Sequence, residues 1–289
     1  MKVLVFGHKG WIASYMIPCL EERGFAVLTP PEGLRADDTE AVSSYIKEVV
    51  PDRVLCLIGR THGEEISTID YLEQPGKLAE NMRDNLFAPL ALAETCADLG
   101  LHFTYMGTGC IFCCERPDQS VPYTESNDPD FFGSSYSIVK GYTDRLLRHA
   151  YNETALNVRI RMPITGDVGP RNFVTKIASY KKVCSIANSM TVLPTLLPIL
   201  ADMVWHKTTG TINLVNPGYI THNEILEMYR LYVDNGFVWE NFTIEEQEKV
   251  LLSKRSNNIL DTTKLVDMYP DVADIHAAVQ GVLKEMAHA

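Results

Sequence analysis

Tyr136 and Lys140 stand four residues apart at the start of a predicted helix. This spacing places both side chains on one helix face. An ammonium group beside a phenol favours the phenolate and lowers the phenol pKa from about 10 toward the working range. Such a tyrosine can donate a proton to a carbonyl oxygen while a nicotinamide cofactor delivers hydride to the carbon. Chance matches to this spacing are common, so its place in the fold decides its meaning.

Two further polar residues fit the same chemistry. Thr108 lies just after the fourth predicted strand, and its hydroxyl can hold the substrate oxygen. A hydroxyl at this place is otherwise an ordinary strand cap. Asn85 lies in the long predicted helix that precedes that strand, and we expect it to brace the network and the cofactor site.

A glycine-containing turn lies directly after the first predicted strand and opens the first predicted helix. It reads Gly7, His8, Lys9, Gly10, Trp11, Ile12, Ala13. The glycines permit a tight turn and let the backbone approach a pyrophosphate, which then lies at the helix N-terminus. Alanine replaces the third glycine of the usual pattern, a mild departure. The position of this turn in a βαβ unit predicts a dinucleotide site.

The residues near the second strand bear on which dinucleotide is bound. NAD sites usually carry an acid about 20 residues after the turn, for the ribose hydroxyls. Here Glu32 is the nearest acid and lies slightly late. Lys9 and Arg35 can instead pair with a 2′-phosphate. We therefore predict NADPH, with NADH as the alternative if these two cations are only solvated surface charges.

Short apolar runs alternate with helical stretches through the first half of the chain. The expected strands are KVLVFG, AVLT, RVLCLI, LHFTYM and LNVRIR, and TINLV is expected to return to the sheet. Strands that are apolar throughout, with helices between them, indicate a parallel sheet covered on both faces. The sequence therefore predicts an α/β protein of the Rossmann type, with a doubly wound parallel sheet.

The pattern loosens after about residue 161, and three helical stretches follow residue 220. They are HNEILEMYRLYV, IEEQEKVLL and the segment from about Val272. We expect these helices to form a smaller lobe over the carboxyl ends of the strands, where open α/β sheets bind ligands. The predicted division is a dinucleotide-binding domain of residues 1–160 and 187–216, and a substrate-binding lobe of residues 161–186 and 217–289.

Composition limits the function classes. The net charge of −11 argues against a general nucleic-acid binder and against binding to an anionic membrane. It does not exclude a small anionic ligand, because a few local donors decide that. No uncharged apolar stretch reaches 18 residues, so no transmembrane helix is predicted.

Seven cysteines are present, an odd number, and most lie in apolar runs. This usage indicates free thiols in a reducing compartment such as the cytoplasm. Cys110, Cys113 and Cys114 are close in sequence, but a structural zinc site needs a second ligand pair. We find no such pair and predict no metal site.

Several segments in the second half resemble one enzyme family. They are TGCIF (108–112), FFGSSYSIVK (131–140), RIRMPIT (159–165), RNFVTKI (171–177), NSMTVL (188–193), NPGYITHNEILEMYR (216–230) and RSNNILD (255–261). The chain is similar to the UDP-4-keto-6-deoxyglucose 3,5-epimerase/4-reductases, which are extended short-chain dehydrogenase/reductases. It resembles the C-terminal half of plant rhamnose synthases over nearly its whole length.

The resemblance implies a reaction. Carbons 3 and 5 of UDP-4-keto-6-deoxy-D-glucose are inverted, and carbon 4 is then reduced with NAD(P)H to give UDP-L-rhamnose. By resemblance, Thr108, Tyr136 and Lys140 are the reductase triad. Cys110 and Lys176 match the acid/base pair of epimerisation. From the residues alone, Cys110 could equally be a buried strand-end thiol and Lys176 a surface helix lysine.

The resemblance also implies contacts and partners. Asn172, at the head of a predicted helix, and Arg255 are expected to bind the phosphates at the UDP end, although Arg255 could be an exposed loop cation. The dehydratase half of the plant proteins is missing, so a separate 4,6-dehydratase is expected to supply the substrate. Homodimers are common in the family. The segment CCERPDQSVPYTESNDPD is shorter than in the plant proteins, so the resemblance does not predict the rim of the pocket.

Two other readings remain at this point. One is a plain 4-keto-reductase of another nucleotide-sugar, linked to dTDP or GDP. Cys110 and Lys176 argue against it, because reduction alone needs neither. The other is a non-enzymatic dinucleotide-sensing protein on the same fold. Such proteins often lose the tyrosine or the lysine, and here both are intact.

Overall fold

A computed structural model describes residues 1–113 and 121–288 of the chain. Cys114, one of the three clustered cysteines, lies outside the described residues. Cys19, Cys56, Cys96, Cys110 and Cys184 form no disulfide. Within the described ranges, no group of His, Cys, Asp or Glu side chains is arranged to hold a metal ion. No helix among these residues has the length and apolar character needed to cross a bilayer.

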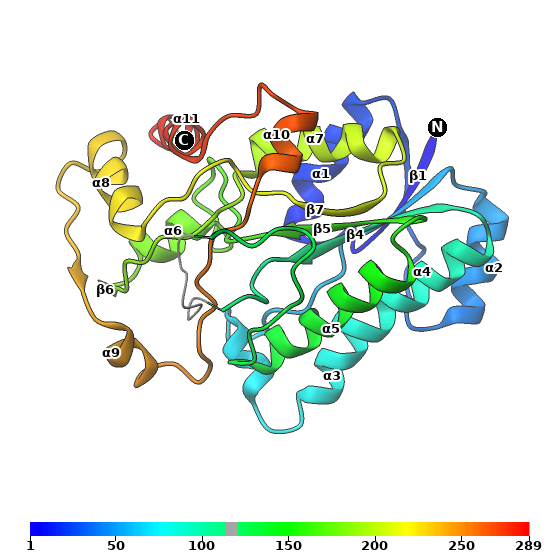
Figure 1. The fold of residues 1–289 in the computed structure, drawn as a ribbon, viewed down its shortest axis with the longest axis horizontal. Coiled ribbons are helices and arrows are strands. Elements are labelled where there is room, and N and C mark those ends of the chain that lie inside the picture. The colour runs from blue at the N-terminus through cyan, green and yellow to red at the C-terminus, as the bar shows by residue number, and fades with distance from the viewer. Residues whose placement is uncertain (114–120, 289) are drawn as a thin grey trace.

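The centre of the molecule is a six-stranded sheet in which every pairing is parallel (Figure 1). Its order is β2-β1-β3-β4-β5-β7. The strands are β1 Lys2–Phe6, β2 Ala26–Leu28, β3 Arg53–Cys56, β4 His102–Thr108, β5 Ala155–Ile160 and β7 Gly210–Asn213. The central strands β3, β4 and β5 are buried at every residue, as a parallel sheet covered on both faces requires. The predicted Rossmann-type α/β fold is confirmed.

Helices cover both faces of this sheet (Figure 1). On one face, α1 (Trp11–Glu22) packs against α7 (Leu193–Trp205), and their apolar side chains join those of the strands in one core. On the other face lie α2 (Thr39–Val49), α4 (Ala88–Asp98) and α5 (Ser135–Ala150). The long predicted helix before β4 is built in three parts, α3 (Leu78–Met82), a π-helical segment η2 (Arg83–Phe87) and α4.

A second core lies beyond the carboxyl ends of the strands. It joins apolar side chains of α6 (Phe173–Ala178), α8 (His222–Tyr232) and α11 (Ile275–Met286). A two-stranded parallel sheet of β6 (Lys182–Val183) and β8 (Glu240–Asn241) lies at this end of the molecule, with α9 (Ile244–Glu248) after it (Figure 1). The expected helical lobe thus has its own core, while the exact division of the chain stays a prediction.

Three elements differ from the sequence-based expectation. Helix α7 was not predicted, because its residues are apolar on nearly all sides and include prolines, so the helical period is hidden. Helix α9 ends at Glu248, although the pattern predicted a helix over the whole of IEEQEKVLL. Helix α10 (Thr263–Met268) packs on the sheet core through Leu265, although the predicted division placed it in the lobe.

Candidate active site

A cavity of about 1780 Å³ opens at the carboxyl ends of the strands, between the sheet and the second core. Most of the predicted site residues line it: Gly7, Lys9, Gly10, Trp11, Ile12, Arg35, Thr108, Cys110, Tyr136, Lys140, Lys176 and Arg255. Asn85 and Asn172 do not. The cavity is larger than the roughly 300–1,000 Å³ typical of a site for one drug-sized ligand. It has room for a dinucleotide and a second ligand together.

The turn after β1 has the geometry of a pyrophosphate site. Gly7 has φ +82°, and a Cβ there would lie 2.8 Å from the carbonyl carbon of Leu57. Only glycine therefore allows the turn to pack so closely on the segment after β3. Gly10 caps α1 without a side-chain hydrogen bond, so no cap side chain competes for the N–H groups of the first turn. These features fit a dinucleotide phosphate at the start of α1.

The two cations predicted to bind a 2′-phosphate lie at the same end of the cavity, and each has an acidic neighbour. Lys9 Nζ is 3.3 Å from a carboxylate oxygen of Glu32, with both side chains exposed. Arg35 Nε is 2.8 Å from Asp37, and its Nη2 is 3.7 Å from Asp84. The exposed Lys9–Glu32 pair is worth at most about 1 kcal/mol and can rearrange around a phosphate, whereas the carboxylates beside Arg35 are largely buried.

Helix α5 carries Tyr136 and Lys140 into the cavity wall. Ser134 caps the helix, its hydroxyl accepting from the backbone N–H of Ser137 at 3.0 Å, and this fixes Tyr136 in the first turn. The phenol of Tyr136 is hydrogen-bonded to Thr108. Thr108 is the last residue of β4, so the sheet and the helix cap together bring these two hydroxyls into contact.

The expected effect of Lys140 on Tyr136 is not found. Burial raises the pKa of Tyr136 well above its usual range, and the hydrogen bond with Thr108 only partly offsets this. The Lys140 ammonium donates instead to the phenol of Tyr105 on β4. Burial lowers the pKa of Lys140 to about 8. The buried ammonium is hydrogen-bonded to Tyr105, and burial penalises the phenolate form of Tyr136.

Asn85 holds the segment after β3 rather than the cavity surface. Its side-chain oxygen accepts from the backbone N–H of Arg60 at 2.9 Å, and its amide nitrogen donates to the carbonyl of Arg60 at 2.9 Å. A third bond, 2.8 Å long, joins it to Asn81. The predicted bracing role fits this geometry, while direct cofactor contact does not.

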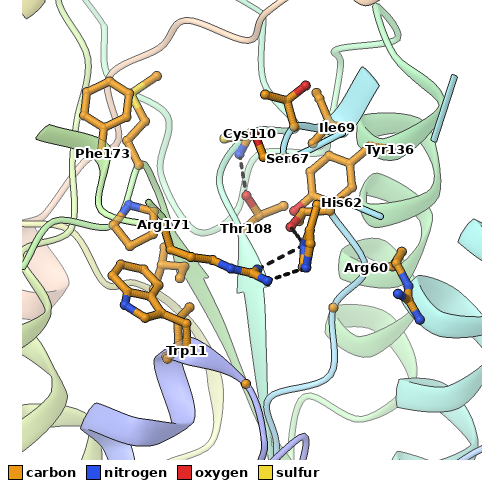
Figure 2. Close-up of a pocket in the computed structure, with 18 of the residues that line it drawn as sticks. Trp11, Arg60, His62, Ser67, Ile69, Thr108, Cys110, Tyr136, Arg171 and Phe173 are labelled. Atoms are coloured by element: carbon orange, nitrogen blue, oxygen red, sulfur yellow. Dashed lines mark hydrogen bonds between the residues drawn. The ribbon is translucent and has the colours of Figure 1, made fainter. Parts of the chain in front are cut away.

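Cys110 and Lys176 reach the cavity from different elements. Cys110 lies two residues beyond Thr108, and its backbone N–H donates to the Thr108 hydroxyl at 3.1 Å (Figure 2). The residue as a whole is partly exposed. Lys176 lies on α6, where burial, followed by repulsion from Arg171 and Arg255, lowers the pKa of its ammonium. A lysine with a lowered pKa is a better proton donor at neutral pH than an ordinary one.

Asn172 does not have the predicted phosphate contact. It is fully buried, and its side-chain oxygen accepts from the N–H groups of Val174 and Thr165. Its amide nitrogen donates to the carbonyls of Thr165 and Asp167, at 2.9 and 2.6 Å. With every hydrogen-bonding position used, Asn172 caps α6 and fixes the loop before it. This is a correction to the expected donor role.

Arg255 does line the cavity, but it is paired with an acid. Its Nη2 donates to Asp70 at 2.7 Å. Burial tends to raise the pKa of Asp70, but hydrogen bonds from Arg255 and Ser253 outweigh it, and the pKa is lowered. The pair connects the 255–258 segment to the short 3₁₀ helix Ile69–Glu73, and Nη1 also donates to Asp70 and to the carbonyl of Ser253, so both terminal nitrogens are engaged.

One contact was not predicted. The guanidinium of Arg171 lies against the imidazole of His62, with Nη1 3.0 Å from Nδ1, and its other terminal nitrogen contacts Nε2 (Figure 2). Burial, followed by repulsion from Arg171, Arg60 and Lys176, lowers the pKa of His62 and keeps it neutral. No ion pair joins Arg171 or Lys176 to an acid in the described ranges. Sequence spacing gives no signal for a contact across 109 residues.

A comparison with family models places the chain. The model of the NAD-dependent epimerase/dehydratase family matches residues 3–192. The chain belongs to this family. Members of the NAD-dependent epimerase/dehydratase family bind the dinucleotide on the kind of sheet and glycine turn described above, and in this family member the turn, the tyrosine and the lysine share one cavity.

The similarity to individual relatives covers nearly the whole of this chain. It is 50% identical to the UDP-rhamnose synthase of Acanthamoeba polyphaga mimivirus, whose crystal structure superposes with a TM-score of 0.95 over 99% of both chains. It is 40% identical to a bifunctional dTDP-4-dehydrorhamnose 3,5-epimerase/dTDP-4-dehydrorhamnose reductase of Arabidopsis thaliana, over 94% of this chain and 89% of the relative.

A third relative is longer than this chain. It is a trifunctional UDP-glucose 4,6-dehydratase/UDP-4-keto-6-deoxy-D-glucose 3,5-epimerase/UDP-4-keto-L-rhamnose-reductase of Arabidopsis thaliana. The identity is 39% over 95% of this chain but only 40% of the relative. This chain therefore matches only one part of that longer protein.

Proposed function

We propose that this chain is a bifunctional 3,5-epimerase/4-keto-reductase that converts UDP-4-keto-6-deoxy-D-glucose to UDP-L-rhamnose with NAD(P)H. One observation carries the proposal: Cys110 and Lys176 line the same cavity as Thr108, Tyr136 and Lys140. Reduction alone needs neither the thiol nor the second lysine. The names of the three relatives, which pair epimerase with reductase or refer to UDP-rhamnose synthesis, support the same reading.

The epimerase step uses the acidity of carbons beside a carbonyl. The thiolate of Cys110 removes the proton at carbon 3 or 5, and the electron pair moves to the carbon-4 oxygen as an enolate. The ammonium of Lys176 then returns a proton to the opposite face, and the configuration inverts. The thiol and the amine exchange protons with solvent before the second inversion. A free cysteine is only a few per cent thiolate at neutral pH, so nearby positive charge favours this step.

The reductase step uses the residues at the end of β4 and the start of α5. Thr108 orients the carbon-4 oxygen, and the phenol of Tyr136 donates the proton that this oxygen needs. Lys140, at the cavity wall, supplies the positive charge. When bound, the nicotinamide cofactor supplies the hydride to carbon 4. The high pKa of Tyr136 keeps the phenol protonated and ready to donate at neutral pH.

The diphosphate of the nucleotide-sugar needs donors in a protein of net charge −11. Arg171, Lys176 and Arg255 gather positive charge on the lobe side of the cavity. Arg171 has the planar fork that suits phosphate oxygens, and its contact with neutral His62 is weak enough to exchange. We propose Arg171 and Arg255 for the diphosphate, in place of Asn172.

The remaining assignments concern partners. A 4,6-dehydratase supplies the keto-sugar, because the name of the trifunctional relative joins that activity to the epimerase and the reductase. A second copy of this chain covers the exposed apolar side chains of adjacent helices, Leu78, Met82, Phe87, Tyr142 and Leu146, which are each about half exposed. Light scattering of the wild type and of Leu146→Glu tests this homodimer.

The deciding experiment is incubation with UDP-4-keto-6-deoxyglucose and NADPH, followed by NMR of the product. UDP-L-rhamnose is expected. A D-configured 6-deoxyhexose would favour the plain reductase, and turnover only with the dTDP- or GDP-linked sugar would change the substrate. Cofactor binding without turnover of any of these sugars would favour the dinucleotide-sensing protein.

A further inference from the structure

Arg161 lies just beyond β5 and is among the largest fully buried side chains. Burying a charge is costly unless it is paired, and a buried arginine usually has a carboxylate beside it. Within the described residues no Asp or Glu lies within ion-pair distance of Arg161. The positive charge of this side chain is therefore held by neutral acceptors alone.

Ser256, one of the residues that supply these acceptors, lines the cavity, and Gly109 lies between the lining residues Thr108 and Cys110. Nη1 donates to the carbonyl of Gly109 at 2.9 Å, and Nη2 donates to the carbonyl of Ser256 at 3.0 Å. Nε donates to the carbonyl of Ser189 at 3.2 Å. A Cβ added at Gly109 would lie 3.0 Å from Cγ of Arg161, so the backbone between Thr108 and Cys110 rests directly on this side chain.

A second buried arginine, Arg159 on β5, gives a contrast. Arg159 is equally inaccessible to solvent, but two of its three guanidinium nitrogens face Asp144, with Nε and Nη2 each 2.8 Å from a carboxylate oxygen. Its charge is neutralised locally. Two residues further along, at the end of the strand where the cavity begins, the neutralising acid is absent for Arg161 among the described residues.

We propose that Arg161 is a positioning residue for the epimerase half-reaction, which holds the 108–110 segment in place and whose uncompensated charge stabilises the thiolate of Cys110. The inference rests on the proposed function in assigning a base role to Cys110. An unneutralised cation next to a thiol favours the anion, and the low dielectric of the interior strengthens that attraction. The neutral acceptors hold the guanidinium without cancelling its charge.

The charges around Cys110 come from two sides. Burial lowers the pKa of Arg161, and interaction with Cys110 acts in the opposite direction. From α5, Lys140 also interacts with Cys110, and so does the phenol of Tyr136. Lys140 already bonds to Tyr105. Arg161 is therefore the cation that contacts the backbone of the Cys110 turn itself.

The test compares Arg161→Gln with Arg161→Lys and with the matched control Arg159→Lys, all at equal folded fraction. The first measurement is alkylation of Cys110 by iodoacetamide across pH 5–10, followed by mass spectrometry of its peptide. In Arg161→Gln we expect alkylation at pH 7 to fall about tenfold and to recover about one pH unit higher. Arg161→Lys keeps the charge, so its half-maximal pH should stay near that of the wild type, as should that of Arg159→Lys.

The second measurement separates this role from simple loss of structure. Deuterium wash-in at carbons 3 and 5 in D₂O should follow the same shift, while reduction of supplied UDP-4-keto-L-rhamnose should fall much less. Unchanged alkylation profiles in Arg161→Gln, or equal losses of exchange and reduction, would overturn the proposal. If Arg161→Gln does not fold, Arg161→Lys decides instead. An upward shift of one pH unit in its half-maximal pH of alkylation would overturn the proposal, because this variant keeps the charge. A different outcome is that the wild type exchanges no deuterium while the alkylation profile of Arg161→Gln is still shifted from that of the wild type. This would overturn the proposed function but would support the effect of Arg161 on Cys110.

Discussion

The ammonium of Lys140 donates a hydrogen bond to the phenol of Tyr105, while the phenol of Tyr136 on the same helix as Lys140 bonds to Thr108. The lysine and the proposed proton donor are thus held by different residues of β4. Tyr105 is fully buried, and burial raises its pKa, so it stays a neutral acceptor. It solvates an ammonium that the protein has removed from water.

Replacing Tyr105 by phenylalanine removes this acceptor. The Lys140 ammonium is then less well solvated, so its pKa should fall further below 8, and more of the lysine should be neutral at pH 7. We expect the alkaline limb of the reduction profile to move to lower pH and kcat at pH 7.5 to fall about tenfold. Steady-state kinetics with UDP-4-keto-L-rhamnose measures this. An unchanged limb would mean that Lys140 does not control the rate.

Lys140→Met tests what burial of this charge costs. The native pKa of about 8 lies below the ordinary 10.5, so between these values the unfolded chain binds more protons and wild-type stability rises with pH. Below pH 8 the wild type carries the full free-energy cost of burying the ammonium, roughly 3 kcal/mol from the pKa difference. The variant escapes this cost but loses the hydrogen bond to Tyr105, so its net gain in stability is smaller. Urea unfolding should find the variant more stable than wild type at pH 7, with the difference narrowing by pH 9.5. A difference independent of pH would contradict this.

Cys110→Ala should stop deuterium wash-in at carbons 3 and 5 while leaving cofactor binding nearly unchanged, because the glycine turn follows a different strand. Residual reduction would then act on the uninverted sugar and yield a D-configured 6-deoxyhexose. Cys110→Ser keeps the shape with a much poorer base, which separates lost chemistry from lost packing. In Lys176→Ala, proton removal at one carbon should survive while inversion fails. Wild-type exchange in Cys110→Ala would make the plain reductase the leading reading.

Tyr136→Phe is expected to give the opposite result. Reduction should fall by several orders of magnitude, because the carbon-4 oxygen loses its proton donor, while exchange in D₂O continues without NADPH turnover. NMR of the exchanged sugar and NADPH absorbance are read on the same sample. Full retention of reduction would remove Tyr136 from the catalytic role.

The cofactor preference depends on two exposed cations. NADPH should have a higher kcat/KM than NADH, because Lys9 and Arg35 line the cavity together with the residues of the glycine turn and can pair with a 2′-phosphate. Arg35→Ser should narrow the ratio by about tenfold while leaving the NADH value in place. A wild-type preference for NADH would indicate that Glu32 binds the ribose hydroxyls.

Local patterns predicted the parts of the site that are local in sequence. The glycine turn, Thr108 and the Tyr136–Lys140 pair each follow from a strand end or a helix start, and the sheet brings them together as parallel topology requires. The phenol that binds Lys140 was not predicted, because the sequence pattern indicates only that Tyr105 is a buried residue of a strand. Asn172 was misassigned because a helix cap and a phosphate donor look alike in sequence. The contact of Arg171 with His62 depends on how the lobe packs on the sheet, which no spacing encodes.

The hydrogen bond between Thr108 and the backbone of Cys110 has a consequence for the product. In the proposed mechanism both half-reactions are arranged around this turn of chain, so a sugar held there is exposed to inversion and to reduction at the same time, and no physical transfer enforces their order. Stereochemical fidelity is then a kinetic partition: the share of L-product equals the chance that both inversions finish before carbon 4 is reduced. Slow exchange at Cys110 would not merely lower the yield of this enzyme but would change which sugar it releases.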